Sequence, residues 1–415
     1  MSKFGTEFFF ARRLSSGDSG RSNNVMVKIA SISVAIGIAV MIVALAVIFG
    51  FKREISDKMA GFMSHVQIRH YDRNNTFETV PISANQPFLN AVSRVDGFRH
   101  ISRYALKPGI LKGEEYFEGI LLKGVGPDYD WSFFGKNLVA GKLPVVSDSV
   151  RYKEVLISQG LASEMKLTEG DSFEVMFIQD SRRRDVFRVA GIYNTDLADV
   201  DNIMVIADIR DVQRLNGWDY DRITGFEIMS ADFDRIEEFS DEVLRVLYSF
   251  YNDIEDQLMV VNLRDNNPVM FDWLETHDLN AAIIITIMLL VSVFNMIAAM
   301  LIILLEKTSF IGILKALGMT DGGIRNVFVI RSSYIILKGM LWGNVAGLLI
   351  CFIQKYTGLV KLSAEGYFLS EVPIFIDWRY IVALNVGVFV VIILFQLLPT
   401  MIISKIKPEK SIRFE

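Results

Sequence analysis

Histidine and cysteine are the side chains found most often in metal sites, and this chain of 415 residues has few of them. Its four histidines are His65, His70, His100 and His277, and no two have the His-Glu-x-x-His spacing or a similar one. The one cysteine, Cys351, completes no ligand set, because structural zinc sites usually take four Cys and His ligands. A metal site is therefore not expected.

The glycines and carboxylates also lack the spacing of nucleotide or calcium sites. The Gly-Lys pairs at 135–136 and 141–142 have neither the upstream glycine nor the downstream hydroxyl of a phosphate-binding loop, so ATP is not expected to bind in that way. Asp196, Asp199 and Asp201 do not have the spacing of a calcium loop and are interpreted as a solvated turn. We therefore expect a protein that is not itself an enzyme.

The elements that must position any functional residue are four apolar stretches, at residues 29–51, 279–305, 332–354 and 380–404. Three of them carry no charge, and the other carries only Lys338. About 20 apolar residues cross the hydrocarbon core of a bilayer as a helix, and lipid offers the backbone polar groups no other partner. We expect four transmembrane helices. The first is too long for the apolar region of a cleaved signal peptide and is expected to be retained.

Lysine and arginine indicate the orientation of these helices. They are concentrated in residues 1–28, 306–331 and 405–415, whereas 355–379 has as many acidic as basic residues. The excess of positive charge on the cytoplasmic side of membrane proteins therefore places both termini in the cytoplasm and residues 52–278 outside it. Acidic residues outnumber basic ones in 52–278, which argues against a nucleic-acid partner.

The large region between the first two apolar stretches mixes strand and helix patterns. Apolar residues alternate in 64–70, 173–177 and 186–189, which predicts strands. The polar segment 179–185 is interpreted as a hairpin tip. Residues 234–252 have apolar positions at helical spacing and are expected to form an amphipathic helix. The fold class is thus a four-helix membrane protein with a large α+β domain, with room for two lobes, inserted between helices 1 and 2.

The segment that joins the second and third apolar stretches has the pattern of a short amphipathic helix. Three apolar residues lie on one stripe of that helix: Ile311, Leu314 and Leu317. Gly318 is expected to end it in a left-handed conformation, and Thr320 or Asp321 can cap the next helix. In the third stretch, glycines four residues apart predict close packing of another helix: Gly339, Gly343 and Gly347.

The motif Glu-Lys followed by Ile-Gly-Ile-Leu-Lys-Ala-Leu-Gly, within residues 306–318, resembles the coupling-helix region of a permease family. This family is shared by macrolide-efflux, FtsX-type and lipoprotein-releasing ABC transporters. Further matches in chain order resemble the lipoprotein-releasing (Lol) permeases and cover nearly the whole chain. They lie at residues 9–14, 43–54, 65–68, 170–171, 187–193, 224–226, 292–307, 372–373 and 398–408.

The resemblance and the apolar pattern together predict the following layout. An interfacial helix and its connection occupy residues 1–24, the transmembrane helices 25–51, 279–305, 327–354 and 380–404, the periplasmic domain 52–278, the coupling loop 306–326, a short periplasmic loop 355–379, and a cytoplasmic tail 405–415.

The resemblance implies a permease subunit in the inner membrane that works with a dimer of cytoplasmic ATPases. ATP and Mg would bind those ATPases, so no cofactor is expected in this chain. A second permease chain is also implied, and either an identical copy or a diverged sister fits. The implied cargo is a triacylated lipoprotein from the outer leaflet of the inner membrane, passed to a periplasmic carrier. A macrolide- or peptide-efflux permease and an FtsX-like signal transmitter remain alternatives.

The resemblance also suggests site residues. The coupling contact with the ATPase is assigned to Glu306, Lys307, Ile311, Leu314, Lys315 and Gly318. An acyl-chain cavity among membrane lipids is assigned to Val43, Val47, Phe51, Ile285, Leu289 and Val293, which ordinary helix packing explains equally well. A carrier contact is assigned to Arg182, Arg183 and Arg184 in the hairpin tip, which is shorter here than the hook of the carrier-recruiting member of the family. A solvated turn is the alternative.

Overall fold

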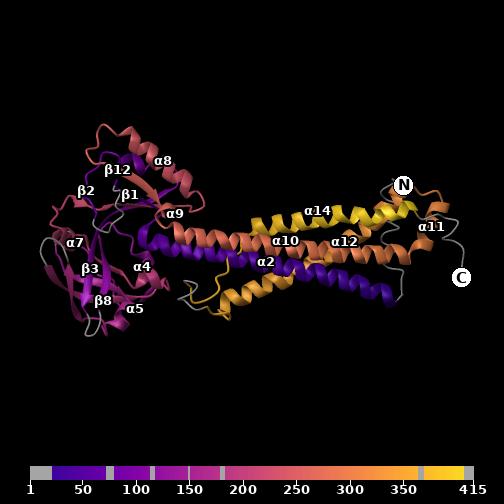
Figure 1. Cartoon of the computed structure of the whole chain (residues 1–415), viewed down its shortest axis with the longest axis horizontal. Helices are drawn as coiled ribbons and strands as arrows, with labels where there is room; N and C mark the ends of the chain where they lie inside the picture. The colour runs from indigo at the N-terminus through magenta and orange to yellow at the C-terminus, as the bar shows by residue number, and fades with distance from the viewer. Residues whose placement is uncertain are drawn as a thin grey trace. The chain divides into compact units, whose positions relative to one another are not determined.

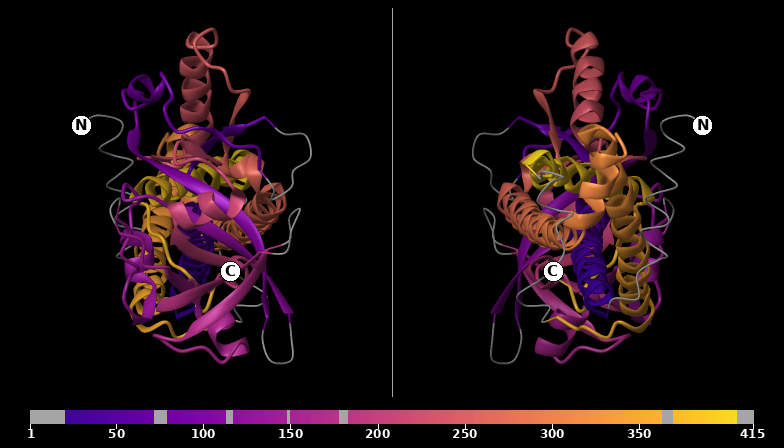
Figure 2. Two further views of the ribbon diagram at one scale, coloured as in Figure 1. Left: turned by 90° about the vertical axis from the view of Figure 1, so that its left-hand side faces the viewer. Right: turned by 90° about the vertical axis from the view of Figure 1, so that its right-hand side faces the viewer.

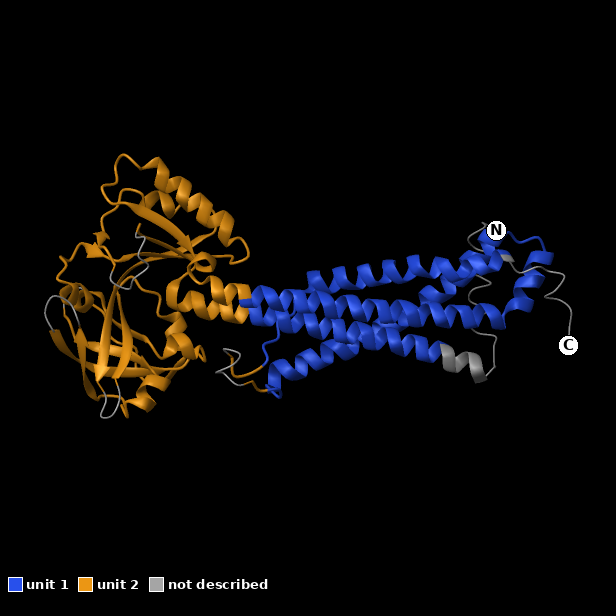
Figure 3. Ribbon diagram, in the orientation of Figure 1, with its two compact units in different colours: residues 1–52, 273–360, 372–415 blue, residues 53–272, 361–371 orange. Residues whose placement is uncertain are grey.

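The computed structural model describes residues 21–71, 79–112, 117–147, 150–177, 183–362 and 369–405. The chain forms two compact units (Figure 3). The membrane unit contains the chain up to Lys52, Trp273–Val360 and the chain from Val372, and the sheet domain contains Arg53–Asp272 and Lys361–Glu371. The predicted interfacial helix in residues 1–20 and the tail from residue 406 lie outside the described residues.

Among the described residues of the membrane unit, four helices are long and apolar enough to cross a membrane. They are α2 (Arg21–Met63), α10 (Pro268–Glu306), α12 (Asp321–Thr357) and α14 (Trp378–Thr400) (Figure 1). A short helix, α11 (Thr308–Ala316), joins α10 to α12, and a 3-10 turn, η1 (Met401–Lys405), follows α14. The helices α2 and α10 extend beyond the apolar stretches, to Met63 and from Pro268, and residues 53–63 of α2 and 268–272 of α10 belong to the sheet domain.

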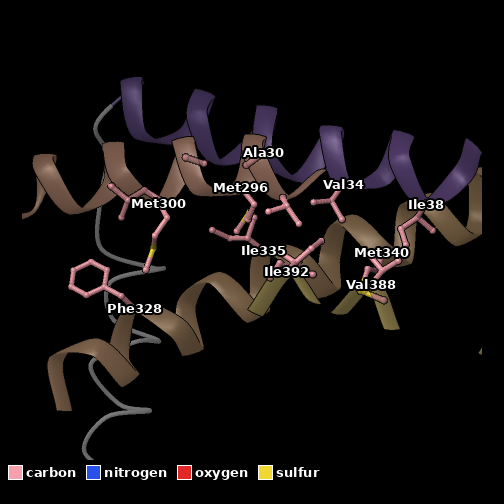
Figure 4. Close-up of a cluster of buried hydrophobic side chains, with 14 of the residues drawn as sticks. Ala30, Val34, Ile38, Met296, Met300, Phe328, Ile335, Met340, Val388 and Ile392 are labelled. Atoms are coloured by element: carbon pink, nitrogen blue, oxygen red, sulfur yellow. The ribbon is translucent and has the colours of Figure 1, made fainter. Parts of the chain in front are cut away.

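Apolar side chains of all four long helices meet in one buried cluster (Figure 4). Labelled members are Ala30, Val34 and Ile38 of α2, Met296 and Met300 of α10, Phe328, Ile335 and Met340 of α12, and Val388 and Ile392 of α14. Polar pairs add to this packing, since Asn344 and Asn385 exchange two side-chain hydrogen bonds of 2.7 and 2.9 Å between α12 and α14.

The three glycines of α12 lie where this helix touches α2. A Cβ atom added to Gly343 would stand 2.6 Å from the carbonyl oxygen of Ala35, and one added to Gly339 would stand 2.7 Å from that of Ser31. At Gly347 the nearest atom would be the Cα of Ala39, at 3.1 Å. The glycine stripe therefore serves contact within this chain, where the two backbones approach closely.

In the described part of the sheet domain, ten strands form one twisted mixed sheet (Figures 1 and 2). The strand order is β12-β1-β11-β3-β4-β9-β6-β8-β5, and β7 pairs with β3 and β8. Two pairs, β4 with β9 and β6 with β8, are parallel. The bounds are β1 (Val66–His70), β3 (Phe98–Lys112), β4 (Phe117–Val125), β5 (Leu138–Gly141), β6 (Glu154–Ser158), β7 (Ser172–Phe177), β8 (Arg183–Tyr193), β9 (Met204–Asp208), β11 (Gly225–Ser230) and β12 (Leu258–Asn262). A separate small pair joins β2 (Ile82–Ser83) to β10 (Arg222–Ile223).

Short helices connect these strands. They are α3 (Leu89–Val92), α4 (Ser132–Lys136), α5 (Gln159–Glu164), α6 (Ala198–Asp201), α7 (Ile209–Asn216), α8 (Ile236–Ser249) and α9 (Leu263–Asn266). The predicted amphipathic helix corresponds to α8, which buries Ile236, Phe239 and Val243. The solvated-turn interpretation is wrong for Asp201. This residue is 5 % exposed, and its carboxylate accepts hydrogen bonds from the backbone N and the Oγ1 of Thr195 at 2.9 and 2.7 Å.

The hairpin of β7 and β8 is regular further towards its tip than the sequence predicts. Arg183 pairs with Phe177 and Arg184 with Met176, so both arginines belong to β8 and not to a polar tip over residues 179–185. The reason is that backbone pairing in an antiparallel ladder does not need apolar side chains. Arg182 lies outside the described residues.

Candidate coupling elbow

The backbone of residues 306–321, here called the elbow, makes a sharp connection between α10 and α12 (Figure 1). Gly318, with φ of 85°, ends α11 in the left-handed region that favours glycine. The backbone N–H groups of Gly318 and Met319 donate to the carbonyls of Lys315 and Leu314, both at 3.0 Å. This Schellman pattern satisfies carbonyls that the end of a helix would otherwise leave free.

The next helix begins immediately after this turn. Thr320 is the N-cap of α12, and its side-chain oxygen accepts a hydrogen bond of 3.3 Å from the backbone N–H of Gly323. The cap satisfies one of the free N–H groups of the first turn of α12. Both ends of the turn are thus fixed by local backbone chemistry.

One face of α11 is fixed in the membrane unit. Ile311 is 0 % exposed and Leu314 is 3 % exposed, and both belong to the buried cluster that the four long helices share. Phe310 and Met319 pack on the same cluster with partly buried side chains. Because Ile311 and Leu314 are covered, their direct role is to hold α11 against the long helices.

Lys315 holds the elbow from its polar side. Its Nζ atom lies 2.9 Å from a carboxylate oxygen of Asp321, at the start of α12. The same atom donates a hydrogen bond of 2.7 Å to the carbonyl oxygen of Ile403, in η1. Lys315 therefore links the elbow to the end of α14 and η1, and its charge is already paired inside the chain.

The opposite face of α11 is apolar but exposed. Ile313 is 47 % exposed and Leu317 is 76 % exposed. The helical spacing predicts Leu317 on the stripe of Ile311 and Leu314, but the structure exposes it, together with Ile313, on the other face. The sequence shows only that α11 has apolar residues on both faces. Which face is exposed is known only from the burial of these side chains in the structure.

The remaining predicted coupling residues lie at the two ends of the elbow. Glu306, the last residue of α10, is exposed, and Lys307 is half-buried at the N-terminal end of α11. Burial lowers the pKa of Lys307, and the nearby Arg331 guanidinium lowers it further. Gly318 is exposed at the other end, and a Cβ added there would meet open space.

The residues assigned to an acyl-chain cavity lie on α2 and α10 and differ in burial. Val293 is buried in the shared cluster, and Val43, Ile285 and Leu289 pack against it with partly buried side chains. Val47 and Phe51 are half-buried. In the described part of the membrane unit, a groove of about 310 Å³ lies between α2 and α10. Its lining is Ile29, Ile32, Ser33, Ile36, Gly37, Met288, Val291 and Ser292.

The two described arginines of the β7–β8 hairpin have partners on their own domain. Arg184 lies 3.7 Å from Glu174 of β7, with 62 % of its side chain exposed. The guanidinium of Arg183 donates to the carbonyl of Leu215 at 3.4 Å. Arg184 therefore remains accessible to a partner, whereas Arg183 is directed towards the end of α7.

Comparison with known proteins assigns the class. Residues 29–246 match the model of the MacB-like periplasmic core domain, and residues 282–408 match that of the FtsX-like permease C-terminal region. The first match covers more than half of the chain. The chain therefore belongs to the family of MacB-like and FtsX-like transporter permease subunits. Four apolar helices and a domain of the periplasmic type fit a multi-pass protein of the inner membrane.

Within that family, the chain is similar over nearly its whole length to lipoprotein-releasing transmembrane proteins. It is 22 % identical to LolC of Xylella fastidiosa over 92 % of both chains. It is 23 % identical to LolC of Neisseria meningitidis over 94 % of both chains. It is also 22 % identical to LolE of Haemophilus influenzae, over 97 % of this chain and 98 % of that protein.

Proposed function

We propose that this chain is the permease subunit of an ABC transporter that takes triacylated lipoproteins from the outer leaflet of the inner membrane and passes them to a periplasmic carrier. ATP and Mg would be bound by a dimer of separate cytoplasmic ATPases, with no cofactor in this chain. A second permease chain would complete the membrane part. In this orientation the termini and the elbow lie in the cytoplasm and the sheet domain in the periplasm, as the distribution of Lys and Arg favours.

The observation that carries this proposal is the two-sided elbow. Ile311 and Leu314 fix one face of α11 in the core of the membrane unit, while Ile313 and Leu317 leave an apolar surface exposed on the other. A coupling element needs both features, because it must contact a partner and pass the displacement on to the helices behind it. The exposed apolar face can bind the ATPase, and α11 is joined through short turns to both α10 and α12.

The lipid side of the proposal rests on the apolar surface of the long helices. Among the described residues, α2 and α10 expose large apolar side chains along the 310 Å³ groove, including Ile32, Ile36 and Val291. Acyl chains have the same chemistry as such a surface, so they can exchange with bilayer lipid on it at little cost in free energy. In the proposed orientation the groove lies in the cytoplasmic half of α2, so cargo in the outer leaflet would contact α2 closer to the sheet domain. The half-buried Val47 and Phe51 remain proposed acyl contacts nearer to the periplasmic end of α2.

A matched pair of surface substitutions tests the coupling role. Leu317→Asp places a charge on the exposed face of α11, and Leu359→Asp places one on a residue that is 72 % exposed just after the opposite end of α12. The native complex with each variant is reconstituted in proteoliposomes that hold a triacylated lipoprotein, and ATP-dependent release is measured in the presence of a periplasmic extract. We expect Leu317→Asp to abolish release and weaken ATPase copurification, with Leu359→Asp close to wild type. Full release by Leu317→Asp would contradict the proposal.

Depletion of the chain in cells separates the alternative functions. Retention of lipoproteins at the inner membrane supports lipoprotein release. Normal sorting together with a defect in cell separation supports an FtsX-like transmitter, and normal sorting with greater macrolide sensitivity supports an efflux permease. The similarity to lipoprotein-releasing proteins over nearly the whole chain favours the first outcome.

A further inference from the structure

The C-terminal end of α2 is buried in the sheet domain, and its last carbonyl groups all have partners there. The carbonyl of Ala60 accepts from the backbone N–H of Ser64 at 2.7 Å. The next three carbonyls accept from side chains of the sheet domain. Tyr129 Oη donates to Gly61 at 3.3 Å, Lys123 Nζ donates to Phe62, and Gln67 Nε2 donates to Met63 at 3.2 Å.

These donors and the carboxylate of Glu227 form a polar group that we call the α2 socket, consisting of Gln67, Lys123, Tyr129 and Glu227, in which all but the half-buried Tyr129 are buried. Lys123 is 1 % exposed and Glu227 is 2 % exposed, and Lys123 Nζ lies 2.7 Å from both carboxylate oxygens of Glu227. Gln67 Nε2 also donates to Glu227 at 3.3 Å. The ammonium of Lys123 lies 5.4 Å from the ring centre of Tyr129, close enough for a cation–π interaction.

Apolar packing fixes the same turn of the helix. The ring of Phe62 is fully buried, 5.4 Å from that of Phe133 and 5.5 Å from that of Phe134. The ring of Phe133 lies so close to Gly61 that any side chain at Gly61 would clash with it. Ser64 then ends α2 with φ of 57°, a conformation that non-glycine residues keep only where their surroundings hold them.

A buried ion pair is a poor choice for stability alone. Well-packed apolar residues in its place are often as stable or more stable, because desolvation of the two charges offsets their attraction. Apolar residues would, however, leave the Phe62 carbonyl without its donor and would place no positive charge at the negative end of the helix dipole. The ammonium of Lys123 donates to the Phe62 carbonyl and places a positive charge at the end of the helix, and Glu227 fixes its position. The arrangement favours a defined attachment of α2 more than stability alone.

We propose that Lys123, held by Glu227, is a positioning residue that fixes the last turn of α2 to the sheet so that a displacement of α2 moves the sheet domain with it. This inference rests on the proposed function, in which motion from the ATPases reaches the periplasm. It adds that Lys123 is the point at which α2 is attached to the sheet. The other end of the same helix contributes Ala30, Val34 and Ile38 to the core of the membrane unit.

The test removes both charges together, because a single substitution would leave the other charge buried and unpaired and could unfold the domain. The variant is Lys123→Met with Glu227→Met, and the control is Lys142→Met with Glu154→Met, an ion pair of 3.8 Å on the same sheet. Spin labels are attached at Glu54→Cys, on the exposed side of α2, and at Ser163→Cys, on the exposed side of α5, after Cys351→Ala. Double electron–electron resonance then measures the distance between the two labels in the full chain. Thermal melting confirms that each variant is folded.

We expect a narrow distance distribution for wild type and control and a broader one for the Lys123 and Glu227 variant. In the reconstituted complex, lipoprotein released per ATP hydrolysed should fall about threefold or more, the effect of breaking an energetic coupling of ordinary size. A narrow distribution in the folded variant would overturn the inference, and so would an unchanged release ratio. If the wild-type complex releases no lipoprotein, the proposed function fails, while the distance distributions still decide whether Lys123 holds the helix.

Discussion

The elbow and the α2 socket both attach a helix to the rest of its unit, but they do so with opposite chemistry. In the elbow, the buried contacts of α11 are the apolar side chains of Ile311 and Leu314, and its other face is exposed. In the socket, the end of α2 is enclosed, and its carbonyls are satisfied by buried polar groups such as Lys123.

The difference follows from what each end of a helix has to satisfy. The side of α11 has no free backbone groups, so apolar contact can hold it, with Lys315 adding a polar link to Ile403, and the outer face stays available to a partner. The last turn of α2 ends inside a protein domain, where unsatisfied carbonyls are costly, so donors are required. Apolar contacts tolerate sliding, whereas hydrogen bonds to successive carbonyls fix one position.

The largest expected effect breaks the socket. Glu227→Leu leaves Lys123 buried without its counter-charge, and we expect a loss of about 3–5 kcal/mol in the free energy of unfolding of the sheet domain. Denaturation of the full chain in detergent measures it, monitored by tryptophan fluorescence, to which Trp131 beside Tyr129 contributes. The control is Glu174→Leu, which removes a half-exposed ion pair with Arg184 and should cost less than about 1 kcal/mol. Equal losses in the two variants would contradict the role given to burial.

The next effect separates the two faces of the elbow. Leu314→Ala should cost about 3 kcal/mol of stability in the membrane unit, because it leaves a cavity in the shared cluster. Leu317→Ala should change stability by less than about 0.5 kcal/mol, since its side chain is 76 % exposed. Thermal melting of the purified chain measures the first effect, and ATPase copurification should be weakened by Leu317→Ala even though that variant is stable. Destabilisation of the chain by Leu317→Ala would show that the exposed face is structural.

A smaller effect depends on pH and arises beside the socket. Burial lowers the pKa of His65 to about 4, and its Nδ1 atom accepts a hydrogen bond of 3.0 Å from the backbone N–H of Ser230. The unfolded chain binds a proton near pH 6.5 and the folded chain does not. The contribution of His65 is therefore complete above that pH and is lost as the pH falls towards about 4.

Between about pH 7 and pH 5, this difference lowers the free energy of unfolding by about 2 kcal/mol. Urea denaturation at several pH values measures how the free energy of unfolding changes with pH. In His65→Asn, the decrease between pH 7 and pH 5 should be smaller by about 2 kcal/mol. A slope that is the same in wild type and His65→Asn would show that His65 keeps its ordinary pKa in the folded chain.

The smallest effect concerns the turn of the elbow. Gly318→Ala places a Cβ on a residue with φ of 85° and should cost about 1 kcal/mol. Gly322, in the first turn of α12, has equal space around it and an ordinary helical backbone, so Gly322→Ala should cost nothing. Thermal melting compares the two variants. An equal response would mean that the left-handed turn does not determine the stability of the elbow.

Several elements were predictable because their signals are local. The alternation in 173–177 corresponds to β7, and the helical spacing in 234–252 corresponds to α8. Gly318 and Thr320 mark the ends of α11 and α12 as their residue types suggest. The sequence pattern does not indicate the long strand β4, because the buried Lys123 interrupts its apolar run. For the same reason, the sequence does not predict the α2 socket, of which Lys123 is part.

The sequence by itself determined the four apolar helices, the end of α11 at Gly318 and the family, since these depend on hydrophobic length, backbone conformation and motif. Only the tertiary structure decided which face of α11 is buried, because apolar residues lie on both faces. It alone brought Lys123 to Phe62 across 61 positions and to Glu227 across 104. A charged pair so far apart in the chain has no local pattern, and it forms only when the folded sheet brings both groups together.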